Sequence, residues 1–198
     1  MKRLLIWVLA GSILSMQTGC VQQDELGNIS VVTGLFLEKH QKNYILIADC
    51  AKVSEQKSGE MTKTQPIRVS APSLEEAFFS LEKHSKTPLY LFRAKVLLVG
   101  KELQENPEGK WLEELFYLRM IPADISVLRA DFTENDLFLQ EDKSFGIPLT
   151  QWLRKEKYFL NCKLYQIIKN QENLQNIPTV SLSENGFFPI TKVKDIKK

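Results

Sequence analysis

The residue with the clearest chemical signature is Cys20, which follows an apolar run near the start of the chain. A basic pair, KR, precedes an apolar core of signal-peptide length at Leu4–Met16. This core is shorter than the about 20 apolar residues of a transmembrane helix. Gly19 directly before the cysteine is typical of a bacterial lipobox, in which the thiol receives a diacylglycerol before cleavage, although Gln17 replaces the usual aliphatic residue. We therefore expect a signal peptide over residues 1–19 and a lipidated Cys20. The alternative is a secreted protein whose Cys20 stays a free thiol.

Removal of the signal peptide leaves a chain whose charges cancel. The sequence has 26 Lys and Arg residues against 24 Asp and Glu residues, and Lys2 and Arg3 account for the difference. A neutral chain argues against nucleic acid as a partner. We expect a short polar tether at residues 20–28, carrying the lipid at its first residue, and a solvated basic tail at residues 194–198.

Residues that could carry catalysis or bind a metal are few. His40 and His84 have no metal-ligand spacing to a cysteine or carboxylate, which argues against a metal site. The signatures of nucleophile-elbow hydrolases, zincins, P-loop proteins and dinucleotide-binding proteins are missing. The sequence therefore predicts no catalytic residue, no metal and no cofactor.

The remaining cysteines and the paired acids have structural interpretations. Cys50 and Cys162 stand alone in the sequence, and we interpret them as buried thiols, with a disulfide as the alternative. The acidic pairs at positions 75–76 and 113–114 fall on predicted helices beside apolar residues. This pattern is typical of solvated helix faces rather than of catalytic carboxylates.

Two basic residues, Arg93 and Lys95, stand inside the most hydrophobic run, Pro88–Gly100. We expect this run to be one long strand, buried on both faces over its inner part, and alternate residues of a strand share one face. Arg93 and Lys95 would then line one edge. They either pair with carboxylates there or mark a contact surface for a partner protein or an anionic ligand.

The elements that must position these residues can be read along the chain. Two β-rich runs around a polar turn at Lys39–Asn43 predict a β-hairpin, and Ser54–Gln65 predicts a solvated loop. A short strand then leads to a helix that starts at Ser73, which has capping-box spacing to Glu76. The apolar face of this helix consists of Leu74, Ala77, Phe78 and Leu81.

The second half of the chain alternates strands and helices. A helix at Lys110–Met120, ended by Pro122, precedes a strand in the stretch DISVLRAD. A short helix capped by Thr133 and Asp136 follows, then one or two helices in residues 148–170, and a hairpin with its turn at Asn185-Gly186. The pattern predicts an α/β fold, a mixed β-sheet with packed helices, in a single main domain over residues 29–193.

The order of these segments resembles the Ger(x)C family, the lipoprotein C subunit of nutrient germinant receptors in spore-forming Firmicutes. Two stretches carry most of the resemblance, DELGNISVVTGLFLEK and VSAPSLEEAFFSLEKHSKTPLYLFRAKVLLVGKEL. The matching positions are Asp24, Glu25, Leu26, Val32, Gly34, Glu38, Lys39, Ser85, Pro88, Leu89, Tyr90, Lys95, Val99, Gly100 and Leu103.

The chain also departs from the family pattern. Arg93 and Ala94 stand where the family often has a histidine, and Val21 and Gln22 stand where a Trp-Asp pair commonly follows the cysteine. The family's chain continues through a further C-terminal domain, whereas this one stops at Lys198. We therefore expect either an N-terminal domain of the family in a short or truncated form, or a related envelope lipoprotein.

The resemblance implies a protein that is not an enzyme. It implies a lipid anchor on the outer face of the inner spore membrane, the cell membrane, beside membrane-spanning A and B receptor subunits that the protein assembles or supports in spore germination. Two other classes stay open. A lipid-anchored binding protein for a small ligand or cell-wall fragment should show a pocket with converging polar groups, and a secreted hydrolase should show a titratable pair in a cleft.

Overall fold

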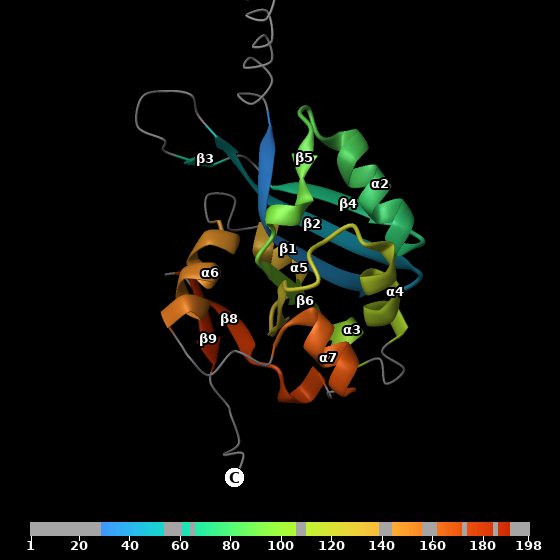
Figure 1. Ribbon diagram of the computed structural model, residues 1–198, viewed down its shortest axis with the longest axis vertical. Coiled ribbons are helices and arrows are strands. Elements are labelled where there is room, and N and C mark those ends of the chain that lie inside the picture. The colour runs from blue at the N-terminus through green and yellow to red at the C-terminus, as the bar shows by residue number, and fades with distance from the viewer. Residues whose placement is uncertain are drawn as a thin grey trace, which may run out of the picture.

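The structure is a computed structural model that describes residues 29–53, 61–63, 66–105, 110–138, 144–155, 162–171, 174–183 and 186–190. Within these ranges the strands form one mixed sheet in the order β3-β2-β1-β6-β7-β8-β9, with β4 also paired to β2 and β5 to β1 (Figure 1). The strands are β1 (Ser30–His40), β2 (Asn43–Val53), β3 (Met61–Lys63), β4 (Ile67–Ala71), β5 (Leu89–Tyr90), β6 (Val96–Val99), β7 (Ser126–Ala130), β8 (Thr179–Ser183) and β9 (Gly186–Ile190). The predicted α/β fold with a mixed sheet is confirmed.

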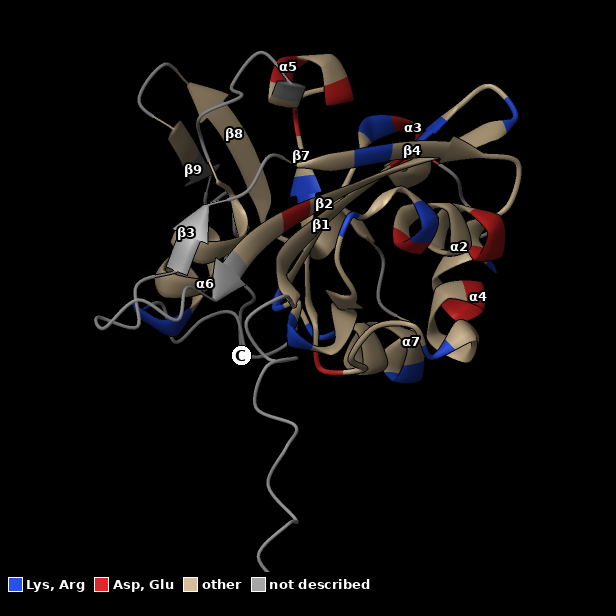
Figure 2. Cartoon of the chain, turned by 90° about the horizontal axis from the view of Figure 1, so that it is seen from above, with Lys and Arg blue, Asp and Glu red and all other residues tan. Residues whose placement is uncertain are grey.

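The helices cover both faces of this sheet. The α-helices are α2 (Leu74–His84), α3 (Lys101–Gln104), α4 (Lys110–Leu118), α5 (Glu134–Phe138), α6 (Gly146–Lys155) and α7 (Leu164–Asn170), and the 3₁₀ helices are η3 (Leu91–Arg93) and η5 (Leu174–Asn176). Seen from above, α2, α4 and α7 lie on one side of the sheet, and α3 and α5 lie on the other (Figure 2).

Strand β1 lies in the centre of the sheet. It forms the predicted hairpin with β2, closed by the pair His40 and Asn43. On its other side β1 runs parallel to β5 and β6, and β6, β7 and β8 continue the parallel arrangement. The inner part of β1, from Leu35 to Glu38, is buried. A strand enclosed on both faces and both edges explains this burial.

Helix α2 begins as its sequence predicts. The Ser73 side chain accepts a hydrogen bond from the Glu76 backbone N–H at 3.2 Å, which makes Ser73 the N-cap. The four apolar residues expected on one face are all buried. The Thr133–Asp136 cap of α5 is also present, since the Asp136 carboxylate accepts from both the backbone N–H and the hydroxyl of Thr133.

The expectation of one long strand over residues 88–100 is wrong. The run is divided into β5, η3 and β6, and β1, with which β5 and β6 pair, carries a bulge between Val32 and Gly34. Before the bulge Ser30 pairs with Leu89, and after it Gly34 pairs with Val96. The β5–β6 segment has three more residues between these pairs than β1 does. The three residues of η3 take up this excess by coiling.

Two other boundaries differ from the sequence expectations. The stretch Ser54–Gln65 is not all loop, because Met61–Lys63 forms β3 and pairs with β2. Helix α4 ends at Leu118 rather than Met120, since Arg119 has a left-handed backbone with φ of 53°. Pro122 therefore lies beyond the end of the helix. Of the one or two helices expected in residues 148–170, two are present, α6 and α7, and α6 begins two residues earlier, at Gly146.

The last hairpin also matches its prediction. Strands β8 and β9 pair from Thr179 with Ile190 to Ser183 with Gly186. Gly186 has φ of +123°, a conformation that L side chains rarely adopt. Asn185, the other expected turn residue, lies outside the described residues.

Candidate functional surface

The lipidation site predicted at Cys20 lies outside the described residues and stays a prediction. What the structure shows is the place where the chain enters the fold. The Ser30 backbone N–H donates to the Pro88 carbonyl at 3.0 Å, and the Ser30 and Thr87 hydroxyls form a hydrogen bond of 2.6 Å. The start of β1 is therefore fixed against the segment that leads into β5.

The two basic residues singled out in the sequence do not share a strand face. Arg93 is exposed and belongs to η3, whereas Lys95 is half-buried in the link between η3 and β6. Lys95 Nζ lies 3.7 Å from Asp124 Oδ2, so it pairs with a carboxylate at the rim. A role for either residue in partner contact stays a prediction.

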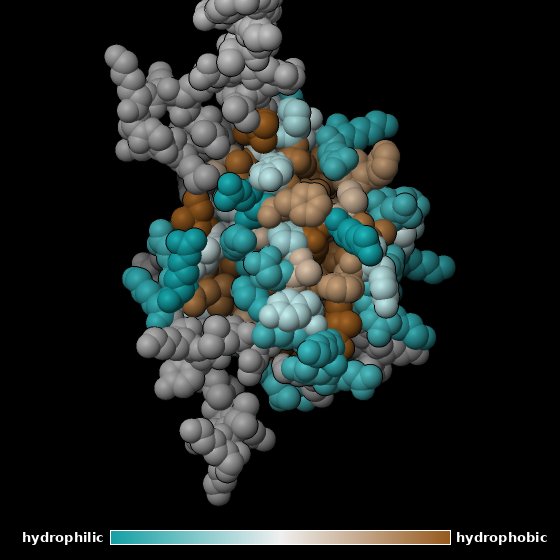
Figure 3. All heavy atoms as spheres, viewed as in Figure 1, coloured by the Kyte–Doolittle hydropathy of each residue, from teal (hydrophilic) through white to brown (hydrophobic). Residues whose placement is uncertain are grey.

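Arg93 is part of an exposed apolar and basic segment beside the entry point of the chain. Lys86, Pro88, Tyr90, Phe92 and Arg93 are all exposed, and we call these five residues the entry surface. Tyr90 is 47% exposed and Phe92 is 57% exposed, and they are two of the five exposed large hydrophobic residues in the described part of the chain. Figure 3 shows apolar side chains reaching the surface over β5 and η3. Such a surface is typical of an interaction site.

The carboxyl ends of β1, β6 and β7 are a second place to look, because ligands of open α/β sheets often bind there. In this chain the buried side chain of Glu38 occupies the space. A methyl group added at Gly100 would lie 2.7–2.8 Å from three Glu38 carbons. Glu38 Oε2 accepts the Glu134 backbone N–H at 3.0 Å, and Glu134 in turn pairs with Arg68 at 2.7 Å. These contacts hold α5 against β1.

The environment of Glu38 changes its titration. Burial raises the pKa of this carboxyl above its ordinary value, and the charges of Glu134 and Glu102 add to the rise. The hydrogen bond from the Glu134 backbone and the nearby His40 act in the opposite direction. In the part of the chain that the structure describes, no group of three or more His, Cys, Asp or Glu side chains is arranged to hold a metal ion.

A buried carboxylate, Asp49, joins α6 to the bulge in β1. Its Oδ2 accepts from the Ser144 hydroxyl at 2.6 Å and from the backbone N–H groups of Phe145 and Gly146 at 3.0 and 2.7 Å. The Thr33 hydroxyl donates to the same oxygen at 3.1 Å. Asp49 therefore satisfies the N-terminal donors of α6 from a neighbouring strand.

Two glycines allow this close approach. A Cβ at Gly34 would lie 2.7 Å from Phe145 Cε2, and a Cβ at Gly146 would lie 2.5 Å from the Thr33 carbonyl carbon. Gly34 belongs to the V-x-G pattern on which the family resemblance rests. Its role here is to let α6 pack directly on β1.

The interpretations of the cysteines and acidic pairs are confirmed. Cys50 and Cys162 are both buried thiols, and burial, with a further contribution from Asp49, raises the pKa of Cys50 to about 12. The glutamates at positions 75, 76, 113 and 114 are exposed. Sequence reasoning missed Asp49, because its partners lie far away in the chain, and missed Tyr90 and Phe92, because an apolar run does not show which side chains stay exposed.

None of the helices that the structure describes is long and apolar enough to span a bilayer. Packed helices on a mixed sheet define an α/β domain.

Comparison with known proteins identifies the family. The family model described as "spore germination protein N-terminal domain" matches residues 22–185, which include nearly all the described elements. The chain therefore belongs to this family, as its sequence pattern indicated. No curated protein and no solved structure matches the chain.

Proposed function

We propose that the protein is a lipid-anchored, non-enzymatic subunit or accessory protein of a spore nutrient germinant receptor. Membership of the spore germination family carries this proposal, because it gives the chain a role in germination. The family match begins at residue 22, two residues after Cys20. The apolar segment before Cys20 ends in a small residue, Gly19. An acylated Cys20 would hold the domain at the outer face of the membrane.

The buried acidic groups support an interaction role. Asp49 accepts four hydrogen bonds through Oδ2, and Glu38 accepts one from the start of α5. Both carboxylates hold a helix to the sheet, which explains their burial without a catalytic step. A module of this kind acts by binding while it is confined to a surface, since tethering raises the effective concentration of its partner.

Arg93 and Lys95 are proposed to contact a partner at the membrane, either a protein or an anionic ligand. Arg93 belongs to η3, which directly follows β5, the strand that pairs with the first residues of β1, so a partner at the membrane can reach it. In the proposed complex the domain assembles or supports the membrane-spanning A and B type subunits.

The first test compares the unmodified chain with Cys20→Ala in a sporulating Firmicute. Cys162→Ala is the control, since it removes a buried thiol and leaves the leader unchanged. In the unmodified chain and in the control, we expect mass spectrometry to find a diacylated Cys20 and fractionation to find the protein in the membrane. The Cys20→Ala variant should show neither the acyl group nor membrane retention. An unmodified Cys20 in a soluble protein would contradict the anchor.

The second test addresses the receptor. Spores that carry Cys20→Ala should lose their response to nutrients, and the anchored chain should be recovered with membrane-spanning subunits after solubilisation. Recovery of the anchored chain without these subunits, together with an unchanged nutrient response, would contradict the receptor role.

A further inference from the structure

The entry surface and the tether attachment form one structural unit. Ser30 and Val31, the first residues of β1, pair in parallel with Leu89 and Tyr90. A membrane anchor attached to the chain before Ser30 would therefore lie closer to β5 and η3 than to the far ends of these strands.

The length of the tether limits how far the domain can move from an anchor. Cys20 and Ser30 are ten peptide units apart, a distance of at most about 35 Å when the chain is fully extended. A more relaxed chain of this length would span roughly 20 Å. An anchored domain therefore stays within about its own width of the bilayer.

The chemistry of the entry surface fits an anionic bilayer. Residues 85–100 contain no acidic residue, and Lys86 and Arg93 flank the exposed rings of Tyr90 and Phe92. Helix α2 adds Lys83 and His84 in its last turn, after Glu82. Aromatic rings lie at the headgroup level of membranes, and basic side chains beside them attract anionic lipids.

We propose that the entry surface lies against the anionic headgroups of the membrane and fixes the orientation of the domain. Tyr90 and Phe92 enter the headgroup layer, and Lys86 and Arg93 contact lipid phosphates. The proposal deepens the contact proposed above by naming lipid as its occupant, and it rests on the anchored state proposed there. A diacyl anchor already gives durable attachment, so the entry surface contributes orientation rather than retention.

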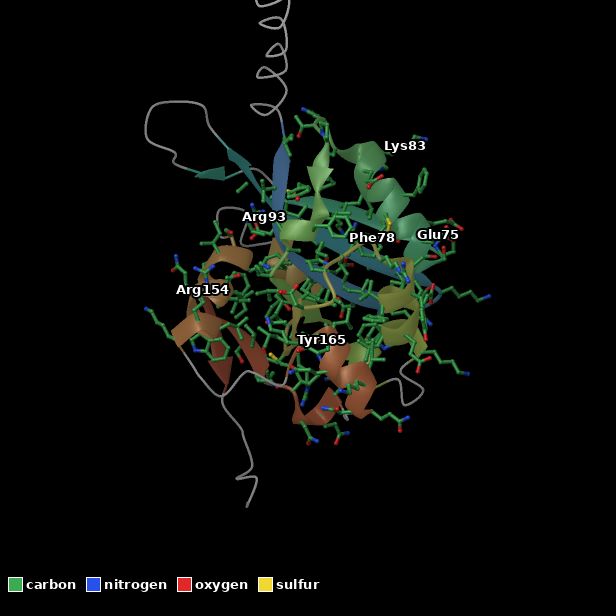
Figure 4. The ribbon with its side chains drawn as sticks, viewed as in Figure 1. Glu75, Phe78, Lys83, Arg93, Arg154 and Tyr165 are labelled. Carbon is green, nitrogen blue, oxygen red and sulfur yellow. The ribbon has the colours of Figure 1, made fainter. Side chains whose placement is uncertain are left out.

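Helix α7 lies further from the start of β1 than η3 does (Figure 4). In Figure 4, Arg93 and Tyr165 lie in different parts of the same view, with Tyr165 on α7 towards the end opposite the tether. Tyr165 is 42% exposed, which matches Tyr90 in residue type and exposure. The two tyrosines therefore offer a matched pair of positions for a probe.

The experiment holds the domain on vesicles without natural acylation. Residues 20–198 with Cys20→Ser and an N-terminal hexahistidine tag are bound to phosphatidylglycerol vesicles through a nickel-chelating lipid. An environment-sensitive fluorophore is placed at Tyr90→Cys or at Tyr165→Cys, because the buried thiols of Cys50 and Cys162 are protected from the label. A nitroxide on the lipid headgroups serves as the quencher.

We expect the fluorophore at position 90 to be quenched and the one at position 165 to keep its emission. Adding Arg93→Gln to Tyr90→Cys should lower the ratio of docked to undocked domain about fivefold, which corresponds to about 1 kcal/mol for one basic residue at an anionic surface. Arg154→Gln on α6, also exposed, is the matched control and should leave the ratio unchanged.

Equal quenching at both positions, or no quenching at position 90, would overturn the proposal. A signal at position 90 that arises only after membrane-spanning receptor subunits are added would also overturn it, because the occupant would then be protein. None of these results depends on natural acylation of Cys20, so failure here is distinct from failure of the lipoprotein assignment.

Discussion

Glu38 shows how one side chain can serve two elements. It belongs to the centre of the sheet, fills the space above Gly100 and accepts a hydrogen bond from the start of α5. Burial removes part of the hydration of the Glu38 carboxylate. This destabilises its charged form and raises its pKa.

The first prediction concerns Glu38→Gln. The folded protein binds more protons than the unfolded chain between pH 4.5, the ordinary pKa, and the raised pKa of Glu38. Unfolding free energy therefore falls as pH rises through this window. Glu38→Gln keeps an acceptor for Glu134 and does not titrate, so its stability relative to the unmodified protein should increase across the same window. Urea unfolding at a series of pH values measures this difference.

Glu113→Gln is the control for Glu38→Gln, since Glu113 is exposed on α4. Its stability difference from the unmodified protein should change less with pH. A difference for Glu38→Gln that stays flat or decreases with rising pH would show that the burial of this carboxylate has no effect on stability.

At the scale of elements, α2 owes its first turn to a local cap. Ser73→Ala removes the acceptor for the Glu76 backbone N–H and should lower the unfolding free energy by about 1 kcal/mol. Ser80→Ala makes the same change inside the helix, where alanine is favoured, and should cost nothing. Urea midpoints compare the two variants, and equal losses would mean that the cap does not contribute.

The packing of α6 on β1 depends on a missing side chain. Gly34→Ala brings a methyl group to 2.7 Å from Phe145 Cε2 and 2.8 Å from Gly146 Cα, so α6 must shift. We expect a loss of about 1–3 kcal/mol, which is typical of overpacking. Amide hydrogen exchange of α6, measured by mass spectrometry, should become faster.

Gly186→Ala is the contrast for Gly34→Ala. A Cβ at Gly186 meets nothing within 4 Å, but the backbone there has a positive φ. This variant should strain the β8–β9 hairpin and leave exchange in α6 unchanged. Faster exchange of α6 in both variants would mean that α6 responds to general destabilisation rather than to the clash at Gly34.

Elements with local causes could be predicted from the sequence, and contacts between distant segments could not. The Ser73 cap and the turn after His40 each depend on a few neighbouring residues. The division of Pro88–Gly100 involves pairing with β1, more than 50 residues earlier, so the apolar run alone could not show it. The contacts of Asp49 with α6 were missed for the same reason.

The candidate site could also be predicted from the sequence only in part. The leader and Cys20 are a local pattern, and the sequence alone marks them. Arg93 was selected because a basic residue in an apolar run is conspicuous, but its neighbours Tyr90 and Phe92 were not, since their exposure depends on η3 turning the chain away from β1.

At the scale of the whole molecule, one hydrophobic core joins all the layers. Cys50 on β2 and Cys162 before α7 both belong to it. In a Cys20→Ser background, a thiol reagent should therefore label both cysteines at a single slow rate that increases with urea and follows unfolding. Mass spectrometry of the labelled peptides measures each rate. Faster labelling of Cys162 would show that the α7 region opens independently.

The central position of β1 has a mechanical consequence. Strand β1 begins at Ser30 and pairs with β2 on one side and with β5 and β6 on the other. A pull along the tether acts parallel to β1 and at a steep angle to its hydrogen bonds, so many bonds on both edges resist it together in shear. A tether joined to an edge strand and pulled across the sheet would instead separate the bonds one pair at a time. A lipid anchor at Cys20 would therefore pull on a strand that is paired on both edges.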